Sequence, residues 1–149
     1  MQKNHKLMDK YDPKQFEQKL YKEWDEKGYF KPSMDKTKPS YSIVMPPPNV
    51  TGKLHMGHAL DAAIQDLFIR YKRMQGYNTL WLPGTDHSAL STEAKIVAQM
   101  KEEGLKKSDI GRAKFLDRAW DWTKLYGGTI VSQQKMLGCS CDWSRARFT

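Results

Sequence analysis

The stretch 42-SIVMPPPNVTGKLHMGHALDAAI-64 decides the fold, because a short apolar run ends in three prolines and then gives way to a helical pattern. Residues 41–45 are apolar and partly β-branched, which predicts a buried strand. Pro46 ends this strand because proline cannot donate to a sheet ladder. A helix is expected from Leu54 to a cap at Gly76. Its apolar stripe is Leu60, Ile64, Leu67, Tyr71 and Met74.

A second apolar run, NTLWL at residues 78–82, completes a strand–helix–strand unit. Strands joined in this way are parallel and have a right-handed crossover, so the fold class is α/β. Trp81 lies in the second strand and is interpreted as core.

The segments on either side of this unit are predicted to be helical. Asp12 and Pro13 predict a helix start and Gly28 a stop, and residues 1–40 are expected to form an N-terminal helical extension. A helix is expected from about Ser91 to Glu103. Two further helices would follow, separated by a break at Gly127-Gly128 and carrying the stripes Phe115, Ala119, Trp122, Tyr126 and then Ile130, Gln134, Leu137.

The composition indicates what kind of partner and cellular location the protein has. The chain has 149 residues and a net charge of +8, which suits a partner rich in phosphate. Cys139 and Cys141 fit a reduced, cytoplasmic protein. The start MQKNHKLMDK is no signal peptide, and no apolar run approaches the roughly 20 residues that a bilayer needs.

The loop at residues 46–52 lies where ligands bind in open parallel sheets, beyond the carboxyl ends of the strands. The following helix points its free N–H groups and positive dipole end toward the same place, which favours phosphate. His55 and His58 share one face of the first helical turn, and Gly52 and Gly57 leave the backbone accessible. A structural role or zinc binding are the alternatives for the histidines, but no third ligand is near, so no metal site is predicted.

His55-Met56-Gly57-His58 resembles the "HIGH" signature of class I aminoacyl-tRNA synthetases. PPPNVTGKLHMGHAL at residues 46–60 and WLPGTDH at residues 81–87 resemble the valine-specific members of that family. GGTIVSQQKMLG and DWSRARFT resemble its further course, so the similarity covers nearly the whole chain, from about residue 11 to residue 149.

The resemblance implies ATP-dependent activation of valine to valyl-adenylate and its transfer to tRNA(Val), with Mg²⁺ accompanying ATP. His55 and His58 would be catalytic, stabilising the displacement at the α-phosphorus. The ATP site would comprise Thr51, Gly52, His55, Gly57 and His58. The valine site would comprise Pro47, Pro48, Asn49 and Asp86, with the Asp86 carboxylate binding the α-ammonium group; a helix cap is the alternative role for Asp86.

The resemblance also implies that residues 41–149 are the first half of a Rossmann-like catalytic domain, ending before the expected insertion of an editing domain. The second signature, KMSKS, and an anticodon-binding domain are not in this sequence. We therefore expect weak activity from the chain alone, and self-association through an exposed sheet edge. Ala89 stands where many relatives have glycine, which predicts ordinary backbone angles there.

Two other functions stay open at this stage. A non-catalytic relative could bind nucleic acid or protein, although it would need neither the HxGH turn nor Asp86. An adenylyltransferase would share HxGH but would have no use for the proline loop or the TDH stretch.

Overall fold

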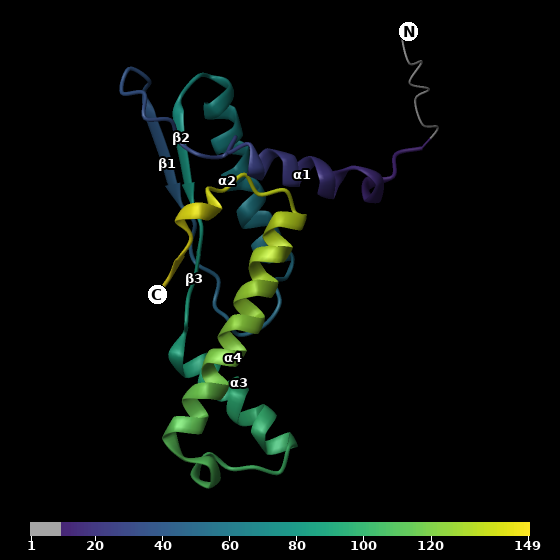
Figure 1. Ribbon diagram of the computed structural model, residues 1–149, viewed down its shortest axis with the longest axis vertical. Helices are drawn as coiled ribbons and strands as arrows, with labels where there is room; N and C mark the ends of the chain where they lie inside the picture. Colours follow the sequence, from purple (N-terminus) through teal and green to yellow (C-terminus); the bar gives the residue numbers. More distant parts are fainter. Residues whose placement is uncertain (1–9) are drawn as a thin grey trace.

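The computed structural model describes residues 10–149, so the first nine residues of the predicted extension lie outside the described residues. Figure 1 shows the arrangement of the elements. In chain order they are η1 (Pro13–Gln15), α1 (Glu17–Glu26), β1 (Ser40–Val44), α2 (Met56–Met74), β2 (Asn78–Leu82), β3 (Gly84–Thr85), α3 (Ala89–Glu102), α4 (Lys107–Met136), η2 (Trp143–Arg145) and β4 (Arg147–Phe148).

The predicted strand–helix–strand unit is confirmed. β1 and β2 pair in parallel, from Ser40 opposite Asn78 to Val44 opposite Leu82. α2 connects them and packs on the sheet through Ala62 and Ile69, which share a buried cluster with Met45, Trp81, Cys139 and Cys141. Trp81 is fully buried, as its interpretation as core requires.

The predicted apolar stripe of α2 does not face this core. Leu60 and Leu67 are each 65% exposed and Met74 is 88% exposed. The buried face carries Ala62 and Ile69, and polar residues flank it: Asp66 accepts from the backbone N–H of Ser140 at 3.1 Å, and Arg70 donates to the carbonyl of Gly138 at 2.7 Å. Periodicity identified an apolar stripe, but a different face, the one that carries Ala62 and Ile69, packs on the sheet.

The predicted break at Gly127-Gly128 is wrong, because α4 continues through both glycines to Met136. Each glycine inside a helix costs roughly 0.5–1 kcal/mol relative to alanine. Contacts on either side of the pair offset that cost, since Trp122 and Gln133 both hydrogen-bond the loop after β1. The one interruption of helical geometry within α4 is at Gly111, where φ is 72°.

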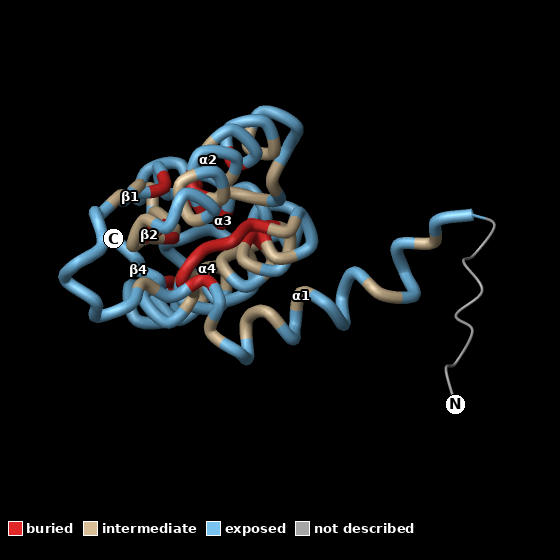
Figure 2. The backbone as a smooth tube through the Cα atoms, turned by 90° about the horizontal axis from the view of Figure 1, so that it is seen from above, coloured by how far each residue is buried: buried red, intermediate tan, exposed pale blue. Residues whose placement is uncertain are grey.

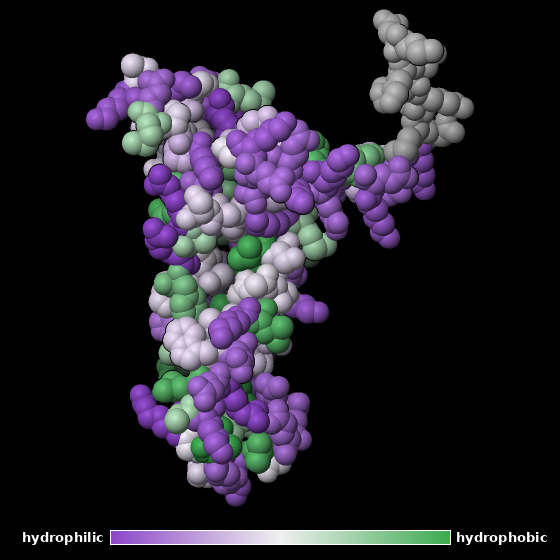
Figure 3. Space-filling model, viewed as in Figure 1, coloured by the Kyte–Doolittle hydropathy of each residue, from purple (hydrophilic) through white to green (hydrophobic). Residues whose placement is uncertain are grey.

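α3 and the first half of α4 form a helical hairpin below the sheet in Figure 1, around a second buried cluster of Ile96, Met100 and Phe115. In Figure 3, apolar side chains reach the surface of this region among polar ones. None of the helices in residues 10–149 combines the length and apolarity needed to cross a membrane.

The Asp12 side chain accepts from the Lys14 N–H at 3.1 Å and so caps the short turn η1, whereas α1 begins only at Glu17, after Phe16, which makes no side-chain capping bond. The predicted stop is confirmed, since Gly28 follows α1 with φ of 69°. Figure 2 shows α1 extending away from the body of the protein, with no buried residue of its own. The helix is held to the rest of the protein by Tyr21, whose hydroxyl donates to the carbonyl of Cys139 at 2.6 Å. The domain boundary at residue 40 stays a prediction.

Candidate functional site

The loops that follow β1 and β2 run side by side beyond the carboxyl ends of the strands. The backbone N–H of Asp86 donates to the carbonyl of Pro48 at 2.8 Å, and the N–H of Val50 donates to the carbonyl of Asp86 at 3.0 Å. These bonds form a parallel bridge between Asn49 and Asp86. The structure thus places two of the predicted valine-site residues next to each other. Pro48 is buried, and Pro47 and Asn49 are exposed.

Helix α4 holds the first of these loops in place. The indole N–H of Trp122 donates to the carbonyl of Val50 at 2.7 Å, and the side-chain carbonyl of Gln133 accepts from the Leu54 N–H at 2.9 Å. Sequence reasoning placed Trp122 in a core stripe and did not single out Gln133. A polar residue that belongs to no motif gives no signal in a single sequence, so its role as an anchor becomes apparent only from the fold.

His55 and His58 form a capping box at the start of α2. The Nδ1 atom of His55 accepts from the Gly57 N–H at 3.1 Å, and the Nδ1 atom of His58 accepts from the His55 N–H at 3.3 Å. An imidazole nitrogen that accepts a hydrogen bond carries no proton, so in its neutral form each ring is protonated on Nε2. Both side chains therefore present an Nε2–H donor at the N-terminus of a helix.

The surroundings of His58 favour its neutral form. Partial burial, and then the neighbouring His55, lower the pKa of His58 below its ordinary value of 6.5. The two ring centroids are 4.0 Å apart, and the positive end of the helix dipole lies at the same place. Protonation on Nδ1 would also break the cap. The site thus offers the two Nε2–H donors and the helix dipole to an anion.

The two glycines of the motif have different surroundings. A Cβ atom on Gly57 would lie 2.9 Å from Cε1 of His55, so the position of the His55 ring requires a glycine there. A Cβ atom on Gly52 would meet nothing within 4 Å, and neighbouring Thr51 is half-buried in the same turn. The space beside Gly52 is therefore open to a ligand.

The Asp86 carboxylate is held by its surroundings. Its Oδ1 atom accepts from the Ser88 N–H at 2.9 Å and from the Thr149 hydroxyl at 2.7 Å. These bonds, with the Ser88 N–H first, lower the pKa of Asp86 below its ordinary value. Ser88, not Asp86, is the N-cap of α3, and it has a left-handed φ of 41°. Ala89 is the first residue of that helix and has ordinary angles, as predicted.

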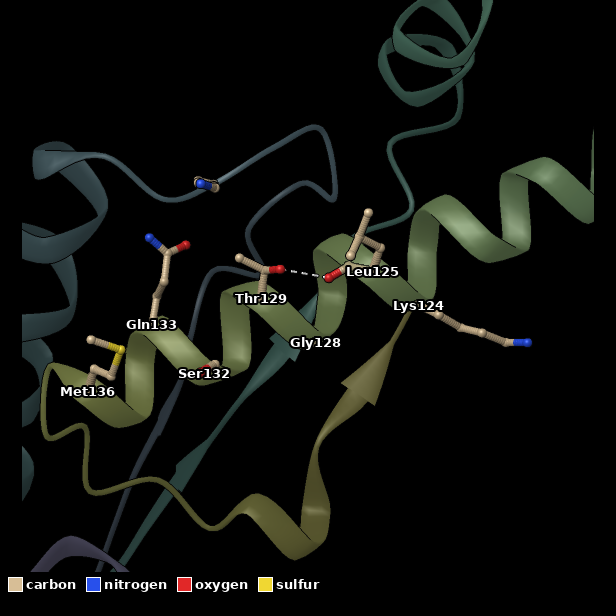
Figure 4. A pocket seen from close by; sticks show the side chains of 8 residues that line it. Lys124, Leu125, Gly128, Thr129, Ser132, Gln133 and Met136 are labelled. Carbon is tan, nitrogen blue, oxygen red and sulfur yellow. Dashed lines mark hydrogen bonds between the residues drawn. The ribbon is translucent and has the colours of Figure 1, made fainter. Parts of the chain in front are cut away.

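A shallow groove of about 570 Å³ lies between the loop carrying Lys53 and one face of α4. Figure 4 shows the side chains that line it, and it was not predicted from the sequence.

The structure records no direct hydrogen bond between the histidine pair and Asp86. No cluster of three or more His, Cys, Asp or Glu side chains suited to a metal is found in residues 10–149, and the expectation of no protein-bound metal stays a prediction.

The fold and these loops define an α/β protein built on half of a Rossmann-like fold, with an HxGH turn at its first crossover helix. Residues 19–149 match the family "tRNA synthetases class I (I, L, M and V)", and the chain belongs to this family. A solved structure supports the fold: LeuRS of Agrobacterium radiobacter K84, in a ternary complex with tRNA and LeuAMS, matches 94% of this chain with a TM-score of 0.75 at 20% identity. That match covers 16% of the LeuRS chain.

Curated relatives point to one branch of the family. The chain is 58% identical over 139 residues to the valine–tRNA ligase of Clostridium acetobutylicum, and 51% identical over 149 residues to that of Bdellovibrio bacteriovorus. These alignments cover 93% and 100% of this chain. The chain spans only 16% and 17% of the length of these two relatives.

Proposed function

We propose that this chain forms the first half of the catalytic site of a valine–tRNA ligase, which activates valine with ATP and transfers it to tRNA(Val). The observation that carries the proposal is the pair of Nε2–H donors at the N-terminus of α2, on the chain segment that leads directly from the Asn49–Asp86 bridge. The proposed sites for the ATP phosphates and for the amino acid would then lie together at the carboxyl end of the sheet. The similarity to valine–tRNA ligases supports the choice of amino acid.

In the proposed reaction a carboxylate oxygen of valine attacks the α-phosphorus of ATP. One P–O bond forms, the bond to the β-phosphate oxygen breaks, and pyrophosphate leaves with its charge. The Nε2–H groups of His55 and His58 donate to phosphate oxygens, and donors aimed at charge that develops in the transition state stabilise it more than the ground state. Mg²⁺ bound to ATP would help to neutralise the charge of the phosphates.

The remaining site residues take positioning roles. In the ATP loop the backbone at Gly52 faces open space, and Thr51 lies half-buried in the same turn. Gly57 makes room for the ring of His55. Pro47, Pro48 and Asn49 border the amino acid, and the ionised Asp86 carboxylate receives its α-ammonium group. The net charge of +8 suits tRNA(Val), and the two free cysteines suit a cytoplasmic location.

The test uses a hybrid in which this chain replaces the matching segment of the Clostridium acetobutylicum ligase, to which it is 58% identical. We expect His58→Ala to lower valine-dependent pyrophosphate exchange by about 10²–10³-fold, the usual cost of one lost transition-state donor. His58→Asn separates catalysis from capping, since its Oδ1 can take the place of Nδ1 in the cap while Nε2–H is lost. The His58→Asn hybrid should have the same free energy of unfolding as wild type but should lose the pyrophosphate-exchange activity.

Two results would count against the proposal. A wild-type hybrid that fails to exchange pyrophosphate with valine, but does so with another amino acid, would contradict the substrate. Exchange by the His58→Asn hybrid within threefold of wild type would contradict the donor role of His58.

Self-association of the chain alone is part of the same proposal. Within the described residues β1 pairs only with β2, so its other edge is unpaired, and Val44 on that strand is 70% exposed. Unpaired edges promote strand addition, and a lysine on the edge opposes it. Light scattering on the 149-residue chain should show concentration-dependent association that Val44→Lys reduces. A monomer at all concentrations would refute this part.

A further inference from the structure

The last residues of the described chain return to the candidate site. β4 pairs in parallel with β3, Gly84 opposite Arg147 and Thr85 opposite Phe148. The Thr149 N–H then donates to the carbonyl of Thr85 at 3.3 Å. This pairing brings the Thr149 side chain to Asp86, although 63 positions separate the two residues in sequence.

The space between these strands is tight. A Cβ atom on Gly84 would lie 2.8 Å from the backbone carbonyl oxygen of Arg147, closer than such atoms approach in proteins. The position of β4, and with it the position of Thr149, therefore depends on the absence of a side chain at residue 84.

The hydrogen-bond directions around Thr149 follow from its single hydroxyl proton. That proton is donated to Oδ1 of Asp86 at 2.7 Å, because an ionised carboxylate only accepts. The Thr149 oxygen accepts from the backbone N–H of His87 at 3.2 Å. Nδ1 of His87 lies 2.9 Å from the same oxygen, so it must be the donor and carry a proton.

These contacts act on one oxygen of Asp86. Oδ1 receives the Ser88 N–H and the Thr149 hydroxyl, and Nδ1 of His87 lies 3.3 Å away. No hydrogen bond to the other oxygen, Oδ2, is recorded from the described residues 10–149. The carboxylate side chain is 35% exposed, so a ligand can reach it. Fixing Oδ1 fixes the rotation of the group and the direction of Oδ2.

We propose that Thr149 is a positioning residue, whose hydroxyl sets the rotation of the Asp86 carboxylate so that Oδ2 receives the α-ammonium group of the amino-acid substrate. The inference rests on the proposed function. A carboxylate that rotates freely must be ordered when the substrate binds, and that cost weakens binding. Thr149 removes the cost in advance, together with the Ser88 N–H.

The test measures KM for valine and for ATP in pyrophosphate exchange by the same hybrid ligase. Thr149→Val keeps the shape but removes the hydroxyl, and should raise KM for valine roughly tenfold, as expected for a lost hydrogen bond to a charged group. KM for ATP should stay within twofold. Thr149→Ser restores the hydroxyl and should return KM for valine to within threefold of wild type.

Thr129→Val is the matched control, because the Thr129 hydroxyl bonds only within α4, to the carbonyl of Leu125 at 2.8 Å. It should leave both KM values unchanged. Gly84→Ala displaces β4 without altering the hydroxyl, so it should raise KM for valine, and adding Thr149→Val to it should cause little further change. Urea unfolding of each hybrid identifies any variant that acts through stability.

The outcomes distinguish failure of the positioning role of Thr149 from failure of the proposed function. An unchanged KM for valine in Thr149→Val, or failure of Thr149→Ser to restore it, overturns the positioning role and leaves the proposed function intact. A wild-type hybrid that shows no valine-dependent exchange overturns the proposed function, and the positioning role with it.

Discussion

Replacing Gly57 by alanine should separate the stability of the HxGH turn from its chemistry. The added Cβ would lie 2.9 Å from Cε1 and 3.1 Å from Nδ1 of His55. The ring must therefore rotate away, and the hydrogen bond from the Gly57 N–H to Nδ1, 3.1 Å long, is lost. The Nε2–H donor then no longer points where the cap had directed it.

Two opposing terms set the change in stability. Loss of an N-cap bond costs about 1 kcal/mol. Alanine in place of glycine inside a helix returns roughly 0.5–1 kcal/mol. The free energy of unfolding should therefore change by less than about 1 kcal/mol. The rate of adenylate formation should nevertheless fall by about 10²–10³-fold, since one transition-state donor is displaced.

The assay pairs urea unfolding with pyrophosphate exchange in the hybrid ligase. Gly128→Ala is the control, because a Cβ atom at that helical position of α4 meets nothing within 4 Å. It should raise stability by roughly 0.5–1 kcal/mol and leave exchange unchanged. Exchange by Gly57→Ala within threefold of wild type would refute the claim that the glycine directs His55.

Three further expectations concern the same loops. Gly52→Ala should raise KM for ATP with no change in stability, measured by exchange and urea unfolding, because nothing in the protein lies within 4 Å of the new Cβ; an unchanged KM would show that no nucleotide lies against this backbone. His58 should titrate below 6.5 by NMR. Because the unfolded chain takes up this proton at higher pH than the folded chain, stability should be fully present above pH 6.5 and fall as the pH drops through the lowered pKa, a slope that His58→Asn removes. Trp122→Phe should cost about 1 kcal/mol in urea unfolding, since the carbonyl of Val50 loses its indole donor; a free energy of unfolding equal to that of wild type would show that Trp122 does not anchor the loop.

Local sequence signals predicted the elements well. Residues 78–82 were predicted as a strand and are one, and the helix ends at Gly28, Gly76, Gly104 and Gly138 all have the positive φ that favours glycine. These features depend on neighbours in the chain, so a single sequence contains the information. Gly127-Gly128 failed as a break because the anchors that keep α4 intact are bonds to a loop over 70 positions away, from Trp122 and Gln133.

In the candidate site, too, some residues could be named from the sequence and others only from the fold. The residues of the HxGH turn could be named from the sequence, as could Asp86. Thr149 could not, since its contact with Asp86 depends on the β3–β4 pairing, and nothing in the last residues of the sequence indicates that pairing. The exposed stripe of α2 shows the same limit, because a pattern identifies an apolar face without identifying what it contacts.

The spacing of the HxGH motif follows from helix capping. His55 is the N-cap of α2 and His58 is its third helical residue, the two positions that a capping box joins. The glycine between them is required because a side chain there would strike the His55 ring. Capping uses Nδ1 of both rings and so places the remaining proton of each on Nε2, which is free to donate. The same bonds that begin the helix therefore leave two oriented Nε2–H donors at its positive end, so helix capping accounts for both the local structure and the proposed phosphate chemistry.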